Sequence, residues 1–144
     1  MQKYDLERFV DAQDRGHSYA DAVHELRRGT KTSHWMWFVF PQVAGLGRSA
    51  MAQAYAITSL GEAQAYLDHP VLGARLRECV AILADLTGRT APEIFGGLDA
   101  LKLRSSLTLF HRAAPDEAGF TRLLEQYFAG EPDPETDRLL SAQG

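Results

Sequence analysis

The residues best suited to chemistry lie in one short stretch of the chain, where aromatic side chains are flanked by polar ones. This stretch contains Lys31, His34, Trp35, Trp37, Phe40 and Gln42. Ligand pockets are commonly built in this way, from an apolar lining with a few placed polar groups. Histidine is the type whose ordinary pKa lies near neutrality, so His34 is the predicted acid–base group if the protein is an enzyme. The same pattern fits a buried structural histidine, so the sequence leaves open whether the protein is an enzyme.

Two further segments carry groups that suit an anion. In loop 45–49, two glycines and Arg48 precede an expected helix, whose start offers free N–H groups and a partial positive charge. Farther along, Lys102, Ser105 and Ser106 share one helical face by their spacing. We therefore predict a pocket for a small anionic or nucleotide-like ligand, formed by segment 34–42, loop 45–49 and helix 102–106. The simpler alternatives are a tight connection at the glycines and a solvated face on the helix.

Several standard chemistries lack their motifs. Loop 45–49 also fits the glycine pattern of dinucleotide-binding folds, but no strand precedes it and no alternating strands and helices follow. The five histidines are scattered without the spacing of a helical metal site, so we expect no metal. Cys79 falls in the apolar stripe of a helix, where a cysteine packs rather than reacts. We expect no cofactor.

The elements that must position these residues are expected to be helices. Apolar residues recur at helical spacing in segments 5–13, 18–28, 49–57, 60–68, 71–86, 100–113, 120–128 and 134–142. Many of these segments follow a capping residue, such as Asp99 or Asp133, or precede a glycine. The predicted fold is all-α: a single compact domain of about seven or eight short to medium helices, spanning 1–144 with a core from about 4 to 140.

The secondary structure of the aromatic run itself depends on weaker signals. Its length fits either a buried strand or two helical turns. We favour a helix because Ser33 can cap it and no second strand candidate exists to pair with it. In a helix, Trp35 and Trp37 point about 200° apart, so they cannot both line one face. The apolar members of the run are also expected to serve the core.

The bulk composition excludes other classes of protein. The chain has 144 residues, of which 45% are hydrophobic and 24% charged, unlike a disordered chain. Its net charge of −4 argues against general nucleic-acid binding. One cysteine fits a reducing cytoplasm, and no signal peptide or membrane-spanning run is found. We expect a cytoplasmic protein without a membrane role; its oligomeric state stays open and a monomer is compatible.

The same segments resemble a known family. Residues 8–13, 33–42, 45–49, 69–72 and 102–110 are similar to the bacterial domain of unknown function 1810 family, with the His-Trp-Met-Trp block as the most distinctive motif. The resemblance extends from about residue 4 to 140 and implies a mainly helical single domain without an established activity. Family members are often labelled calpastatin, but calpastatin is disordered, whereas this chain is rich in core-forming residues. The resemblance carries over no catalytic residues.

Two other functions compete with the predicted pocket. The aromatic run, if exposed, would suit a protein-interaction module, because tryptophan and arginine often anchor interfaces. Alternatively, all the residues named have purely structural roles. The positions of His34, Arg48 and Lys102 discriminate between these hypotheses, since a pocket requires them to converge on a concave surface.

Overall fold

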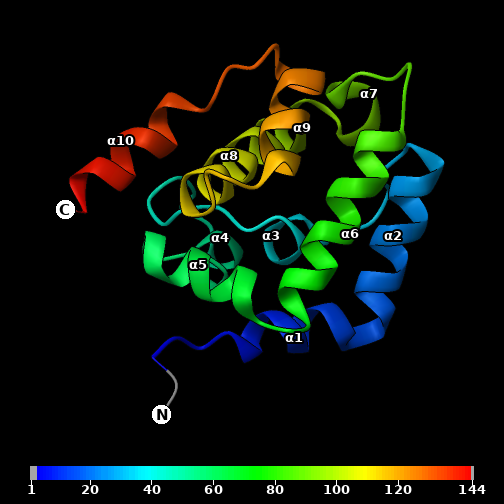
Figure 1. The fold of residues 1–144 in the computed structure, drawn as a ribbon. Coiled ribbons are helices and arrows are strands. Elements are labelled where there is room, and N and C mark those ends of the chain that lie inside the picture. The colour runs from blue at the N-terminus through cyan, green and yellow to red at the C-terminus, as the bar shows by residue number, and fades with distance from the viewer. Residues whose placement is uncertain (1–2, 144) are drawn as a thin grey trace.

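Helices joined by short connections make up the computed structural model, which describes residues 3–143 (Figure 1). They are α1 Glu7–Asp14, the 3-10 turn η1 Arg15–His17, α2 Ser18–Arg28, α3 Met36–Val39, α4 Ala50–Ala54, α5 Leu60–Asp68, α6 Leu72–Asp85, α7 Ala91–Phe95, α8 Gly97–Ala113, α9 Ala118–Phe128 and α10 Pro134–Ala142. Between residues 3 and 143, β-type pairing is limited to an isolated bridge of Val43 with Ile57. The predicted all-α class is confirmed. Helices outnumber the expected seven or eight, since α3, α4 and α7 are separate helices of four or five residues.

Helices α6 and α8 organise the packing of the others. Helix α6 contacts α2, α5 and α9, while α8 contacts α5, α7, α9 and α10. Helix α1, at the bottom of the view in Figure 1, packs against both α2 and α3. One continuous hydrophobic core runs through these contacts, and its largest fully buried side chains include Trp35, Tyr66, Phe9, Phe40 and Phe110. The short helix α3 therefore lies with most of its side chains in the core.

The backbone requires glycine at two positions near the ends of these helices. Gly29 ends α2 with φ of +76°, a left-handed conformation that glycine adopts without strain, and its N–H donates to the carbonyls of Glu25 and Leu26. Gly73 lies where α6 passes the end of α5, and a Cβ there would collide with the carbonyl oxygen of Leu67. The first glycine turns the chain toward α3, and the second permits close packing of α5 and α6.

The helix caps agree with the sequence in part. Asp133 caps α10, and Thr90 with Glu93 forms a full capping box at α7. The predicted cap Ser33 is wrong, because α3 begins two residues later, with Trp35 at its N-cap. The predicted cap Asp99 is also wrong. Helix α8 begins at Gly97, so Asp99 lies inside its first turn and its carboxylate is available to other partners.

Candidate ligand-binding site

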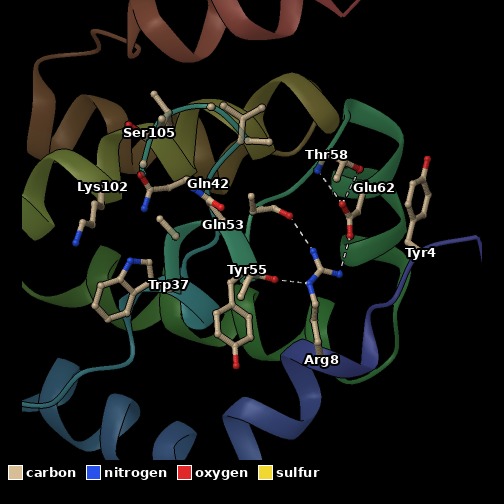
Figure 2. A pocket seen from close by; sticks show the side chains of 18 of the residues that line it. Tyr4, Arg8, Trp37, Gln42, Gln53, Tyr55, Thr58, Glu62, Lys102 and Ser105 are labelled. Carbon is tan, nitrogen blue, oxygen red and sulfur yellow. Dashed lines mark hydrogen bonds and ion pairs between the residues drawn. The ribbon is translucent and has the colours of Figure 1, made fainter. Parts of the chain in front are cut away.

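A cavity of about 840 Å³ lies between the start of α1, the 42–47 loop, α4 with the residues after it, and the N-terminal half of α8. Figure 2 shows Trp37 and Lys102 at one end of this cavity. Arg8 and Glu62 lie at the other end, and Tyr55 lies between the two (Figure 2). Its volume is within the range of small-molecule sites. The two ends differ in how completely their charged groups are already bonded.

At the α1 end, the charges of Arg8 and Glu62 are fully committed to the protein. The Arg8 guanidinium donates to the carbonyls of Ala54 and Ala56 at 2.9 and 2.8 Å, and to Glu62 Oε2 at 3.0 Å. The other oxygen, Glu62 Oε1, accepts hydrogen bonds from the N–H and hydroxyl of Thr58 at 2.8 and 2.9 Å. Since the Glu62 side chain is buried, this pair fastens α1 to the segment between α4 and α5. Both residues line this end of the cavity, and the pair offers no free charge to a ligand.

At the α8 end, two lysines share a single carboxylate. Lys31 Nζ lies 2.8 Å from one oxygen of Asp99, and Lys102 Nζ lies 3.2 Å from the other. Burial alone would raise the pKa of Asp99, but hydrogen bonds and positive charge from the lysines outweigh it and hold this pKa below its ordinary value. The Lys102 ammonium also lies 4.6 Å from the centre of the Trp37 ring. Among these three side chains the positive charges thus outnumber the negative by one, and Lys102 is the ammonium group that lines the cavity.

The segment that leads into α3 is held by a buried glutamate of α2. Glu25 Oε1 accepts hydrogen bonds from the N–H groups of Thr32 and Ser33 at 2.7 and 2.8 Å. It also accepts one from Trp35 Nε1 at 3.0 Å. Burial opposes the charged form of Glu25, but these hydrogen bonds outweigh it and lower its pKa to about 2. The Glu25 carboxylate thus fixes the backbone directly after Lys31 and satisfies the indole N–H of the buried tryptophan.

Of the residues predicted for the pocket, four line the cavity: Trp37, Gln42, Lys102 and Ser105. Ser105 has a structural task as well, since its single hydroxyl proton is shared between the carbonyl of Leu101, at 3.1 Å, and the carboxylate of Asp133, at 2.9 Å. The contact with Asp133 ties α8 to the capped start of α10, and it accounts for a serine in the middle of a helix. Trp37, Gln42 and Lys102 are the members available to a ligand.

The remaining predicted residues lie outside the cavity lining. Trp35 and Phe40 flank α3 and are buried in the core, where Trp35 packs against Phe40 and Phe95. Ser106 is also buried, and its hydroxyl has no hydrogen-bond partner among residues 3–143. Lys31 reaches the site only through Asp99, while the side chains of His34 and Arg48 are exposed to solvent. These six are Lys31, His34, Trp35, Phe40, Arg48 and Ser106. His34, Arg48 and Lys102 therefore do not converge as the predicted pocket required, and the observed cavity forms without the predicted acid–base group and without the loop arginine.

Several residues of the site were not predicted from the sequence. Asp99 was taken for a helix cap, although its spacing to Lys102 fits an i,i+3 ion pair. Glu25 lies three residues from Ala22 on the buried face of α2, and a charged residue at such a position signals a buried partner. Nothing in the sequence marks Leu98 and Leu101 as site residues. Their exposure to solvent distinguishes them, and only the structure shows it.

Other chemistry has little basis in the described chain. No three His, Cys, Asp or Glu side chains between residues 3 and 143 are close enough together to hold a metal ion. Burial raises the pKa of the Cys79 thiol to about 12, and the side chain is fully inaccessible, so it is unsuited to nucleophilic attack. Over the same residues, no helix combines the length and apolar character needed to cross a membrane.

Comparison with known proteins identifies the family. The family model described as protein of unknown function (DUF1810) matches residues 3–140. The chain belongs to the DUF1810 family. A relative with a solved crystal structure is the conserved hypothetical protein Rv1873 from Mycobacterium tuberculosis. Its sequence is 51% identical to that of this chain. The match covers 97% of this chain and 99% of that one, with a TM-score of 0.93.

The comparisons confirm the family resemblance and support the all-α fold of this DUF1810 protein. None of the curated proteins compared with the chain matches it. The description of the solved relative names no activity, substrate or partner. Function is therefore argued from the site itself.

Proposed function

We propose that this DUF1810 protein binds a small organic anion in the cavity, at the end formed by Trp37 and Lys102. The observation that carries the proposal is the shared carboxylate of Asp99. Two ammonium groups, from Lys31 and Lys102, face this single negative charge, so the three side chains together carry one net positive charge next to the cavity. A ligand anion would supply the balancing negative charge.

The surroundings of Lys102 suit a ligand of this kind. An ammonium group has three donors, and the contact with Asp99 at 3.2 Å uses one of them. Trp37, which is half-buried, adds an aromatic surface next to the charge, and Gln42 adds an amide able to donate and accept. A ligand that combines an anionic group with a ring or chain would use all three. The proposal is for binding and assigns no reaction, since His34 lies outside the cavity lining.

A thermal-shift screen with nucleotides, sugar phosphates and carboxylates tests the proposal. A ligand at about 100 times its Kd stabilises the native state by about 2.7 kcal/mol, which raises the unfolding midpoint by several degrees. Lys102→Gln and Trp37→Phe are expected to abolish or strongly reduce the shift. The matched control is Arg28→Gln, which removes an exposed positive charge on α2 outside the cavity. A shift that survives both cavity substitutions, or a screen without any shift, contradicts the proposal.

The alternative of an interaction module built on an exposed aromatic run has less support. Trp35, Phe38 and Phe40 are each at most 6% exposed, so they present no surface to a partner. The proposed setting for ligand binding is the cytoplasm, in keeping with a single, unpaired cysteine.

A further inference from the structure

Helix α8 presents an unusual combination of side chains to the cavity. Leu98, Leu101, Lys102 and Ser105 all line it, and their spacing places them along one face of the helix. Leu98 and Leu101 are the most exposed large hydrophobic side chains of residues 3–143, at 77% and 60%. Exposed leucine surface is stabilised when an apolar group covers it. Leu98 and Leu101 therefore form an apolar strip next to the Lys102 ammonium group, on the same face of the helix.

We infer that the ligand is an amphipathic monoanion, with a single anionic head group at Lys102 and an apolar body along Leu98 and Leu101. This inference rests on the proposed function and narrows its ligand class. Leu98 lies one helical turn from Lys102, a distance of about 6 Å along the axis. An apolar body must therefore extend at least about that far from the head group to cover both leucines.

The charges of the lining favour one negative charge over several. Three cations, Lys3, Arg8 and Lys102, and two carboxylates, Asp5 and Glu62, line the cavity, which leaves one net positive charge. Arg8 is occupied by Glu62 and by two backbone carbonyls. A chain of phosphates would thus meet carboxylates without enough free cations to balance it. A carboxylate or another single anionic group is balanced by Lys102 alone.

The rest of the wall agrees with an apolar body. Beyond α8, the cavity is lined by Val43, Ala44, Leu46, Ala52 and Tyr55, which contribute hydrocarbon and ring surface. Trp37 continues this surface up to the ammonium group of Lys102, 4.6 Å from its ring centre. Head-group and apolar contacts are therefore contiguous, as recognition of an amphipathic molecule requires.

Calorimetric titration with a matched set of probes tests this inference. The probes are octanoate, butanoate, octanamide, inorganic phosphate and ADP, each used below the concentration at which micelles form. Octanoate is expected to bind at least about tenfold more tightly than butanoate, because part of its additional chain is removed from water. It should also bind about tenfold more tightly than octanamide, which has the same chain without the charge.

Substitutions separate the two parts of the site. Lys102→Gln is expected to lower octanoate affinity to that of octanamide without changing octanamide binding. The double substitution Leu98→Ser with Leu101→Ser should lower octanoate affinity to that of butanoate. Because both leucines are exposed, this variant is expected to fold, and circular dichroism verifies that it does. The control is Val71→Ser, which alters an exposed apolar residue outside the cavity and should leave binding unchanged.

The outcomes distinguish this inference from the proposed function. If ADP or phosphate binds in a Lys102-dependent way and octanoate binds no more tightly than butanoate, the amphipathic ligand class is refuted while anion binding stands. If octanoate binds with the same affinity as octanamide, the anionic head group of the amphipathic ligand is refuted; if in addition neither ADP nor phosphate binds in a Lys102-dependent way, the proposed function is refuted as well. Both are also refuted if none of the charged probes binds.

Discussion

Replacing Glu25 with glutamine should destabilise the protein through the segment that carries Lys31 and Trp35. The carboxylate accepts three hydrogen bonds on one oxygen, at 2.7, 2.8 and 3.0 Å. Glutamine keeps the shape and one oxygen acceptor but removes the charge that strengthens these bonds. The expected result is a lower free energy of unfolding near neutral pH, with the all-α fold retained.

The magnitude follows from the pKa of Glu25, which is about 2 instead of its ordinary 4.5. At about 1.4 kcal/mol per pKa unit, this difference corresponds to about 3 kcal/mol, and screening by solvent reduces it to about 2 to 3 kcal/mol. Because the folded pKa is the lower one, this stability is present above the ordinary pKa and is lost as the pH falls through about 4 toward 2. The difference between Glu25→Gln and the parent protein should therefore be largest near pH 7 and nearly vanish near pH 2.

Urea unfolding at pH 7, 5, 4 and 3, followed by circular dichroism, measures this difference. Glu125→Gln is a matched control, since it removes an exposed carboxylate on α9 and should change stability by less than about 0.5 kcal/mol. A loss below about 0.5 kcal/mol for Glu25→Gln at pH 7 would refute the reasoning. So would a loss that stays constant from pH 7 to 3.

Three further substitutions or reactions test other parts of the account. Asp99→Asn removes the carboxylate that competes for Lys102, so it should tighten octanoate binding about threefold or more, measured by calorimetry; unchanged or weaker binding would contradict the role of the shared carboxylate. Arg8→Met leaves the buried Glu62 without its cation and should cost about 3 kcal/mol in urea unfolding, whereas a cost below about 1 kcal/mol would show that the pair does not fasten α1. The Cys79 thiol, whose pKa is about 12, should react with iodoacetamide at pH 8 only as fast as the protein opens; rapid modification of the native protein, followed by mass spectrometry, would contradict its burial.

The helices could be predicted from the sequence because their signals are local. Periodic apolar residues and the Asp133 cap act within a few residues of one another, and the structure contains them as expected. The separate directions of Trp35 and Trp37 also follow from local geometry, once the aromatic run is taken as helical. Fold class was therefore accessible before any tertiary contact was known.

The site was less predictable because its members meet through tertiary packing. Lys31 and Asp99 are 68 positions apart in the chain but form an ion pair at 2.8 Å. The side chain of Asp99 suited a helix cap by sequence, and only the observed start of α8 at Gly97 frees it for the lysines. His34 and Arg48 had suitable chemistry, but both lie exposed outside the cavity. Residue type predicts what a side chain can do, whereas packing decides what it faces.

The indole N–H signals of the two tryptophans provide the most direct test of the central claim, that an organic anion binds at the cavity end formed by Trp37 and Lys102. Protein labelled with 15N is titrated with octanoate, ADP and inorganic phosphate, and Trp37→Phe assigns the two indole peaks. The account predicts that at least one of these anions shifts the Trp37 peak in a saturable way and leaves the peak of the buried Trp35 in place. It also predicts that Lys102→Gln removes the shift. If no anion moves the Trp37 peak, or if its shift persists without Lys102, the claim is contradicted.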